Sequence, residues 1–205
     1  MKHLLAIAIT GLLGAAPVGQ TAYTNDFEKL EIGKAPEDAM ILNGEFAVKK
    51  EGDNQYLEVA PTPLNSFGLL IGPDGQPLRS VSARIRGDAT GKRTPEFGVG
   101  LGGVGGYLLW VMPAVGELQI LCGDDPVARV PFEWKPGTWT MLRLNLRPDG
   151  GKWVVEGKAW PQGQPEPEKW MISTMAEKEP AGRASIWGTP YSEKVIGFDD
   201  VVIGR

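Results

Sequence analysis

Histidine and cysteine are almost absent from this sequence. Its 205 residues include one histidine, His3, and one cysteine, Cys122. Because His3 lies in an N-terminal segment that we expect to be removed, the mature chain has no imidazole, which excludes Ser-His-Asp catalysis, Cys-His catalysis and zinc sites with histidine ligands. The single cysteine excludes an intrachain disulfide, and its alternation with Leu118 and Ile120 predicts a buried, unreactive thiol.

A strong excess of charge of either sign is also missing. Lysine and arginine number 21, aspartate and glutamate 25, and the formal net charge is −4, with no block of like charge. This balance predicts neither nucleic acid nor a membrane surface as a partner. The 42% of hydrophobic residues is enough for one sizeable core in an ordinary folded domain.

One apolar run suggests a targeting segment, and it stands at the N-terminus. The run Leu4–Ala16 follows a short basic start and ends in small residues. This pattern is typical of a secretory signal peptide, and the run is shorter than the ~20 residues of a spanning helix. We predict a signal peptide over residues 1–22, cut between Ala16 and Ala22. One domain over residues 23–205 then remains, with no membrane span, in a secreted, extracellular or periplasmic location.

No segment carries a convincing helical stripe. The nearest candidate, Glu168–Glu179, is flanked by prolines and contains Met171–Met175, which is also typical of a strand. The rest of the chain alternates with period two, most clearly in Ser80–Arg86, Thr140–Arg147 and Trp153–Trp160. Shorter candidate strands are Phe46–Lys50, Tyr56–Val59, Phe67–Ile71, Phe97–Leu101, Tyr107–Met112, Glu117–Cys122, Ala128–Val130, Ala184–Trp187 and Phe198–Ile203. So many short strands spaced by turns predict an all-β antiparallel sandwich or barrel.

Four short motifs follow one another along this pattern. They are Asp26-Phe27-Glu28, Trp134–Thr140 leading into Leu142–Leu146, Gly182–Trp187, and the closing Phe198–Ile203. In this order they resemble the concanavalin A-like (laminin G-like) jelly-roll superfamily. The resemblance implies two curved antiparallel sheets, the concave one of which often binds a saccharide. It covers lectins, carbohydrate-binding modules, glycoside hydrolases and polysaccharide lyases, and fold alone does not choose among them.

The acidic residues argue against the hydrolase branch without excluding it. Acids two residues apart occur only at the N-terminal end or in turns, at Asp26/Glu28, Glu51/Asp53, Glu166/Glu168 and Glu177/Glu179. The Glu-x-Asp-x-x-Glu pattern of the glucanase branch is therefore missing from every interior strand. Two carboxylates from different strands remain an alternative, with Glu96, Glu117 and Glu156 as candidates. The lyase branch usually relies on a histidine or tyrosine base, and the mature chain has no histidine.

Polar side chains on three alternating strands suggest a ligand site. They are Arg84 and Arg86; Arg143, Asn145 and Arg147; and Glu156, Lys158 and Trp160. If these polar faces share the concave sheet, they form a cationic platform with an aromatic floor, which suits an acidic glycan. The alternative is that these charges only solubilise an exposed sheet face.

The aromatic residues extend this hypothesis. Trp160 shares the polar face of its strand and is the best candidate for an exposed indole, whereas Trp139, Trp153 and Trp187 are predicted to lie in the core. Tyr107 and Trp110 belong to a strand that is apolar on both faces. They are candidates for the hydrophobic floor of the same cleft.

A structural calcium site is a further expectation. Asp26 and Glu28 project to one side of a strand, and the resemblance implies that the first and last strands lie close, beside Asp199 or Asp200. Calcium binds 6 to 8 oxygen ligands in proteins. Because Asp199 and Asp200 are adjacent in a strand, we expect only one to participate. The alternative is that these acids cap turns or accept hydrogen bonds.

The sequence therefore predicts a secreted, non-catalytic domain that binds a polysaccharide or other glycan, in an oligomeric state that it does not indicate. A glycoside hydrolase or polysaccharide lyase with carboxylates assembled across strands is one alternative. A module that contacts protein is the other.

Overall fold

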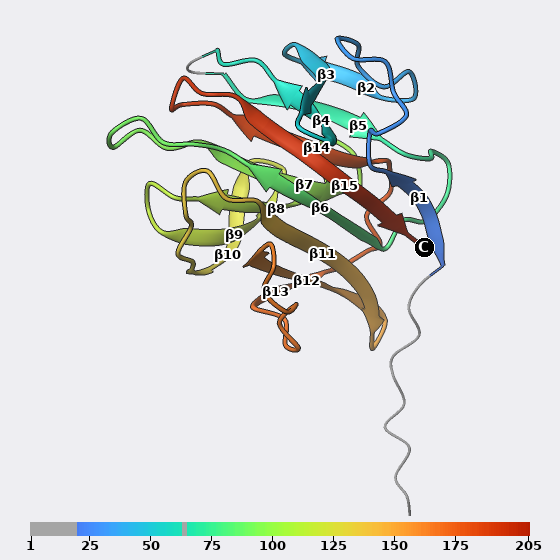
Figure 1. Cartoon of the computed structure of the whole chain (residues 1–205). Coiled ribbons are helices and arrows are strands. Elements are labelled where there is room, and N and C mark those ends of the chain that lie inside the picture. Colours follow the sequence, from blue (N-terminus) through green and yellow to red (C-terminus); the bar gives the residue numbers. More distant parts are fainter. Residues whose placement is uncertain (1–19, 63–64) are drawn as a thin grey trace, which may run out of the picture.

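Every regular element that the structure describes is a β-strand (Figure 1). The computed structural model describes residues 20–62 and 65–205, and the strands in these ranges form two antiparallel sheets. This confirms the predicted all-β sandwich. Residues 1–19, most of the predicted signal peptide, lie outside the described residues. Within the described part, no helix has the length and apolar character needed to cross a membrane.

The first sheet has eight strands, and both ends of the described chain belong to it. Its order is β13-β12-β11-β6-β15-β4-β3, with β1 beside β15. The strands are β1 (Thr21–Asn25), β3 (Phe46–Glu51), β4 (Asn54–Val59), β6 (Ser80–Arg86), β11 (Thr140–Asp149), β12 (Lys152–Pro161), β13 (Ile172–Ala176) and β15 (Ile196–Gly204). The first and last strands are therefore neighbours, as the resemblance implied.

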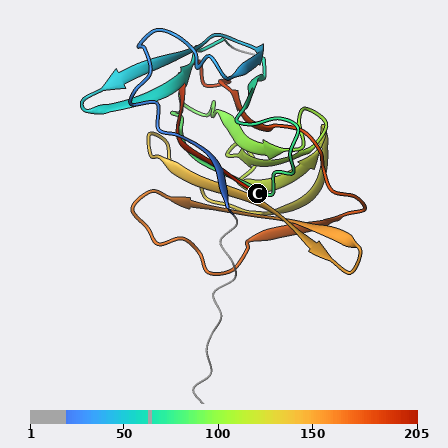
Figure 2. The same cartoon turned by 90° about the vertical axis from the view of Figure 1, so that its right-hand side faces the viewer.

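The second sheet has seven strands, in the order β10-β9-β8-β7-β14-β5-β2. They are β2 (Met40–Asn43), β5 (Phe67–Ile71), β7 (Glu96–Leu101), β8 (Tyr107–Met112), β9 (Glu117–Cys122), β10 (Asp125–Pro131) and β14 (Ala184–Thr189). Figure 2 shows the two sheets as separate layers. The chain crosses repeatedly between them, since β5 and β7 belong to one sheet and β6 to the other. This is the connectivity of a jelly roll.

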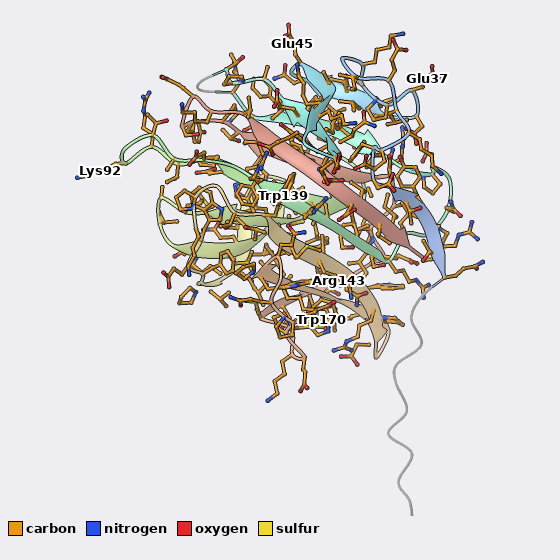
Figure 3. The ribbon with its side chains drawn as sticks, in the orientation of Figure 1. Glu37, Glu45, Lys92, Trp139, Arg143 and Trp170 are labelled. Atoms are coloured by element: carbon orange, nitrogen blue, oxygen red, sulfur yellow. The ribbon has the colours of Figure 1, made fainter. Side chains whose placement is uncertain are left out.

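Alternation along the strands sorts side chains between the two sides of each sheet. In β11, Leu142, Leu144 and Leu146 are buried, while Arg143 and Asn145 between them are only partly covered. The same alternation runs through β6. Because neighbouring side chains in a strand leave on opposite sides, the outer face of the eight-stranded sheet is polar (Figure 3).

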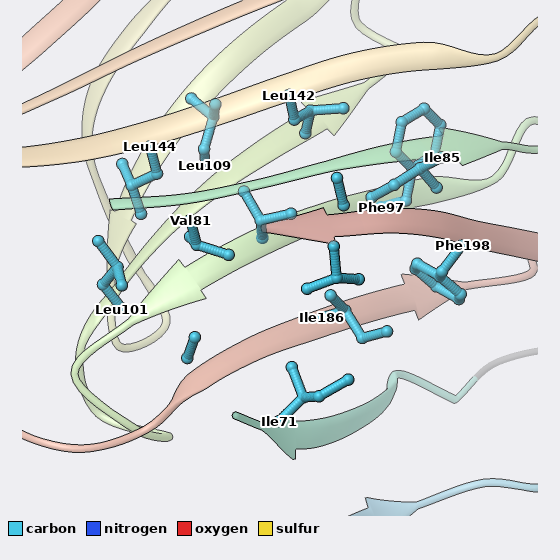
Figure 4. Close-up of a cluster of buried hydrophobic side chains, with 14 of the residues drawn as sticks. Ile71, Val81, Ile85, Phe97, Leu101, Leu109, Leu142, Leu144, Ile186 and Phe198 are labelled. Atoms are coloured by element: carbon cyan, nitrogen blue, oxygen red, sulfur yellow. The ribbon is translucent and has the colours of Figure 1, made fainter. Parts of the chain in front are cut away.

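The core lies between the two sheets (Figure 4). Val81 and Ile85 of one sheet and Phe97, Leu109 and Ile186 of the other have no exposed surface. Burying one such side chain contributes about 1.5–3 kcal/mol relative to leaving it in water. This packing fixes which face of each strand points outward.

Two strands were not predicted. β1 carries threonine, tyrosine and asparagine, and all four residues of β2 are exposed, so neither shows the alternation that marks a half-buried strand. Both are held by pairing, β1 with β15 and β2 with β5. The ambiguous segment after Pro167 contains β13, which confirms its interpretation as a strand.

Candidate functional site

Eight of the ten predicted ligand residues come together on one surface. The register pairs Arg143 with Lys158 and Asn145 with Glu156, and Arg84 lies on the neighbouring strand β6. We call this surface, on the outer side of the eight-stranded sheet, the cationic face. It comprises Arg84, Arg86, Arg143, Asn145, Arg147, Glu156, Lys158 and Trp160. Strands β6, β11 and β12 therefore present these residues on the same side of the sheet.

The positive charges of the cationic face are already paired. Each arginine has a guanidinium nitrogen close to a carboxylate oxygen. The nitrogen–oxygen distance is 2.7 Å for Arg84–Asp199, 2.6 Å for Arg86–Glu51, 2.8 Å for Arg143–Glu166 and 3.3 Å for Arg147–Glu156. Each pair compensates a positive charge with a carboxylate. The face therefore carries many polar groups but little net positive charge.

The segment between β12 and β13, residues 162–171, folds over part of this face. Its Glu166 lies 2.8 Å from both Arg143 and Lys158. The Lys158 ammonium also donates to the Pro167 carbonyl at 2.7 Å and lies 4.6 Å from the Trp170 ring centroid. We call residues 162–171 the strap. It leaves the Lys158 side chain only 8% exposed.

The expectation of an exposed Trp160 is wrong, because its exposed fraction is 7%. Alternation predicts the side on which a side chain leaves its strand, but it does not predict what packs over that side. The more accessible indoles on this side of the molecule are Trp139 and Trp170, which Figure 3 labels together with Arg143.

Trp139 is a site residue that the sequence reasoning missed. It was expected in the core, yet its ring centroid lies 4.9 Å from the guanidinium carbons of both Arg84 and Arg86. Tyr56 meets its edge with centroids 5.9 Å apart. Trp139 immediately precedes β11. Extending the alternation of that strand back from Met141 predicts that Trp139 lies on the outer side, so the sequence held a signal for its position. A pocket of about 310 Å³ lies beside Arg86, Tyr56 and Gly197.

The four acids predicted to bind calcium do not converge. Glu28 accepts a hydrogen bond from the Gln55 amide at 2.9 Å, and Asp26 accepts one from the Glu28 amide at 3.2 Å, in a turn after β1 rather than in a strand. Asp199 instead accepts hydrogen bonds from Arg84 at 2.7 Å and from Asn54 at 2.9 Å. The residues described contain no group of three or more acids, cysteines or histidines suited to a metal. This donor set does not fit calcium.

Asp199 and Asp200 also differ from expectation in direction. Both carboxylates reach Arg84, since Asp200 lies 3.0 Å from its Nε, although without the alignment of a hydrogen bond. The reason is a register shift between Asp199 and Val202, with Asp200 at φ 49°. A β-bulge of this kind interrupts strict alternation. Because of the bulge, both carboxylates lie beside Arg84 and form an ion-pair cluster with it.

The other sheet presents a different outer face, crossed by a continuous line of paired residues. The register connects strands β5, β14, β7, β8, β9 and β10 in turn. The paired residues are Gly68, Trp187, Gly98, Trp110, Gln119 and Arg129. They face outward because their strand neighbours, such as Ile186 and Leu109, are fully buried in the core. We call this line the tryptophan row.

Glycines determine how the two indoles of the row lie. A Cβ atom on Gly98 would come within 2.7 Å of the Trp110 ring, and one on Gly68 would overlap the Trp187 ring. Each ring therefore lies across the glycine of the neighbouring strand. Trp110 is 7% exposed, whereas Trp187 is only partly buried and offers more of its ring to solvent. Trp187 was expected in the core, and its position here corrects that expectation.

Two carboxylates lie next to the tryptophan row, each held by a donor from it. Trp110 Nε1 donates to Glu96 at 3.2 Å, and Gln119 Nε2 donates to Glu117 at 2.6 Å. Burial raises the pKa of Glu96, and the Trp110 hydrogen bond offsets only part of that effect. Neither Glu96 nor Glu117 has an ion-pair partner among the residues described.

Tyr107 and Trp110 do not join the cationic face, because β8 belongs to the opposite sheet. Trp110 belongs to the tryptophan row, but Tyr107 points inward and packs against the core. Its pKa is raised by burial and by the adjacent Cys122. Cys122 lies on the inner side, as predicted, and is partly rather than fully buried.

No known family model and no curated protein matches this sequence. Solved structures do match it. The carbohydrate-binding module CBM66 from Bacillus subtilis is 10% identical with a TM-score of 0.56, over 82% of this chain and 96% of that chain. The Emp46p carbohydrate recognition domain in its metal-free form is 11% identical with a TM-score of 0.57, over 90% of this chain and 95% of that chain.

A xylan β-1,4-xylosidase from Bacillus halodurans C-125 is 11% identical with a TM-score of 0.61, over 95% of this chain but only 41% of that chain. The Emp46p domain also has a potassium-bound structure, with 11% identity and a TM-score of 0.53, over 82% of this chain and 88% of that chain. At these identities the likeness concerns the fold. The strand order and these superpositions together show that the chain has a jelly-roll sandwich fold.

Proposed function

We propose that this protein binds a carbohydrate on the outer face of the seven-stranded sheet, along the tryptophan row. The observation that carries the proposal is the register, which aligns Trp187, Trp110 and Gln119 beside Glu96 and Glu117. Similar folds in a protein named as a carbohydrate-binding module and in one named as a carbohydrate recognition domain support the same class of ligand.

The chemistry of this face suits a sugar. An indole ring stacks on the apolar face of a pyranose, and Trp187 provides the more accessible ring. Carboxylates and side-chain amides hydrogen-bond hydroxyl groups, and Glu96, Glu117 and Gln119 provide both kinds of group close to the rings.

The charges of this face favour a neutral glycan over an acidic one. The two carboxylates, Glu96 and Glu117, outnumber the single arginine of the row, Arg129, so the net charge of these residues is negative. This negative charge would repel a sugar carboxylate or sulfate. On the cationic face an acidic glycan would first have to displace carboxylates such as Glu166 from Arg143. We therefore replace the acidic glycan of the sequence prediction with a neutral one.

Export belongs to the same proposal. Residues 1–22 have the pattern of a signal peptide, and residues 23–205 then form the mature single domain. Because β1 begins at Thr21, a cut in the earlier part of the range between Ala16 and Ala22 leaves the whole sandwich in the mature chain. N-terminal sequencing of the protein recovered from a bacterial periplasm or medium tests the cut: a start between residues 17 and 23 supports it, and an intact Met1 contradicts it.

A glycan panel with two matched tryptophan variants tests the binding site. Trp187→Ala removes the accessible ring of the row, and Trp139→Ala removes a comparable indole from the opposite sheet. We expect saturable binding of at least one neutral glycan, about tenfold weaker in W187A and unchanged in W139A. Both variants are checked for folding by their near-UV circular dichroism.

Two results would contradict the proposal. Binding of an acidic glycan that is lost in W139A or in Arg143→Ala but kept in W187A would place the site on the cationic face. A folded protein that binds no glycan of the panel would leave a protein-interaction module as the better interpretation.

A further inference from the structure

A cavity of about 730 Å³ lies beside β1, the edge strand that pairs with β15. It is lined by residues 23–26, by residues 29–31 and 34–38 of the loop that follows β1, and by residues 200–202 of β15. Figure 1 shows β1 and this loop in blue. The volume falls in the range of about 300–1,000 Å³ that is typical of small-molecule sites. We call this space the β1 cavity.

Hydrogen bonds hold the walls of the β1 cavity in place. The Gly33 amide donates to the Val48 carbonyl at 2.8 Å, and the Val48 amide donates to the Lys34 carbonyl at 2.8 Å, which ties the loop to β3. Within β1, the Asn25 side-chain amide donates to the Tyr23 hydroxyl at 2.8 Å. Walls that are already ordered lower the entropic cost of binding a ligand.

The lining offers an apolar surface. Leu30 and Ala35 pack against the core, Pro36 is buried, and Val202 is 38% exposed. Together with the Tyr23 ring, these side chains give the apolar part of a ligand a place to leave water. Burial raises the pKa of Tyr23, so its phenol stays neutral and adds no negative charge to the lining.

Acidic residues outnumber basic ones in this lining, which holds five carboxylates and two lysines. Two of the carboxylates are compensated. Glu31 lies 2.8 Å from the Lys34 ammonium, and Asp200 lies 3.0 Å from Arg84 Nε. The charges that remain decide which ligand the cavity favours.

The remaining charges of the lining are mainly negative. Asp26, Glu37 and Asp38 have no ion-pair partner among the residues described, and the remaining lysine is Lys29. Arg183 donates to the backbone carbonyl of Asp38 and is not part of the lining. Even when Arg183 is counted, carboxylates are in excess, and this excess favours a positively charged ligand.

We propose that the β1 cavity binds a small organic cation, in which an ammonium group is attached to an aromatic or aliphatic body. The body covers the apolar surface of Leu30, Ala35 and Val202, and the ammonium group lies at the acidic rim. A metal ion fits this lining poorly, because no group of three or more metal-binding side chains occurs in the described part of the chain. The tryptophan row belongs to the opposite sheet, so the two sites are independent.

Titration calorimetry with three indole compounds tests the charge preference. Tryptamine is a cation, tryptophol is neutral and indole-3-acetate is an anion, and all three share one ring system. We expect tryptamine to bind saturably with a Kd below about 1 mM. Tryptophol should bind at least about fivefold more weakly, and indole-3-acetate should not bind measurably. Added salt should weaken the binding of tryptamine more than that of tryptophol.

Two charge variants should act with opposite signs. Glu37→Gln should weaken tryptamine binding by about threefold or more, and Lys29→Gln should strengthen it by about twofold or more. Glu45→Gln is the matched control, because Glu45 is an exposed glutamate outside the lining, and Figure 3 labels it together with Glu37. It should leave the affinity unchanged. A general loss of structure would not produce opposite effects at residues 37 and 29.

A further variant locates the site. Val202→Phe fills the β1 cavity and should abolish tryptamine binding, whereas Val195→Phe changes a valine of the same 38% exposure outside it and should not. Trp187→Ala should also bind tryptamine normally. Binding that survives in a folded V202F, binding lost in W187A, or equal affinity for tryptamine and tryptophol overturns the proposal. A folded wild-type protein without saturable tryptamine binding overturns it too. If V202F does not fold, the opposite signs at Glu37 and Lys29 decide.

Discussion

At the scale of single residues, Gly68 and Gly98 determine the shape of the tryptophan row. Neither has a positive φ, so neither is needed for an unusual backbone conformation. Their role is to leave space for the rings of Trp187 and Trp110. At Gly98 a Cβ would also overlap the Leu109 backbone, whereas at Gly68 its three nearest atoms all belong to the Trp187 ring. Gly68 is therefore the position where the ring can be displaced without disturbing a neighbouring strand.

Gly68→Ala should move the Trp187 ring off the sheet. Because the added methyl group occupies the place of ring carbons, we expect a loss of about 1–3 kcal/mol in the free energy of unfolding. Glycan affinity should fall as it does in W187A. Urea unfolding and titration calorimetry measure the two effects. Gly105→Ala is the control, since a methyl group at that position would have no other atom within 4 Å and the φ of Gly105 is ordinary. Equal affinity in G68A and wild type would show that the ring position does not matter.

Glu96 should make stability depend on pH. Burial raises its pKa in the folded state above the value of about 4.3 in an unfolded chain. The folded state then binds the proton more tightly, so stability is greatest below the unfolded pKa and falls as pH rises through the folded pKa. Glu96→Gln removes this loss. We expect E96Q to gain stability relative to wild type between pH 3.5 and pH 7.5, measured by urea unfolding.

The same pH comparison has an internal control. Each pH value compares E96Q directly with wild type, so the other titrating groups contribute equally to both proteins. A wild-type protein that becomes more stable relative to E96Q as pH rises would contradict a raised pKa at Glu96.

At the scale of elements, the strap shows how a loop changes the chemistry of a sheet face. Glu166 joins Arg143 of β11 to Lys158 of β12, and the strap carries the Trp170 ring over the same ammonium. The strap thereby covers Lys158 almost fully, although the sequence pattern predicts that this lysine is exposed to solvent. Its burial is tolerated because a carboxylate, a carbonyl and a ring surround it.

Glu166→Ala should loosen the strap. Lys158 would keep its carbonyl and ring contacts but lose its carboxylate, which is itself 32% exposed. We expect a loss of about 1–2 kcal/mol in the free energy of unfolding, below the value for a fully buried pair. Hydrogen exchange should rise at residues 162–171. Lys152→Ala, which removes an exposed pair with Glu177, should cost less than about 0.5 kcal/mol. Similar losses in both variants would contradict a special role for the strap.

The sequence predicted elements better than it predicted their surroundings. Alternation located β6, β11 and β12 and the side on which Arg143 and Leu144 leave their strand, because period two is a local property. It failed at Trp160, which is covered by tertiary packing, and at Asp200, where a bulge breaks the period. Neither the packing over Trp160 nor the bulge at Asp200 can be recognised from the few residues around each position.

At the scale of the whole molecule, topology decides which site residues meet. Arg143 and Trp110 both looked like parts of one platform, yet their strands β11 and β8 belong to opposite sheets. Local pattern does not report which strands share a sheet, since the chain changes sheet between β5, β6 and β7. The tryptophan row shows the same limit, because its six members come from six strands and are far apart in the sequence.

The arrangement gives the protein two outer faces of different chemistry. On one, arginines and lysine are neutralised by carboxylates and partly covered by the strap. On the other, indoles lie across glycines beside carboxylates that no cation compensates among the described residues. The second face combines stacking surface with hydrogen-bonding groups that are not committed to ion pairs. That difference is the reason for placing the glycan there.

An NMR titration of isotope-labelled protein with the glycan identified by the panel tests this placement most directly. We expect the largest shifts on the indole and amide signals of Trp187 and Trp110 and on the side-chain amide of Gln119. Signals of Trp139, Arg143 and Trp170 should stay in place. Shifts confined to those three residues, with no shift in the tryptophan row, would contradict a glycan site on the seven-stranded sheet.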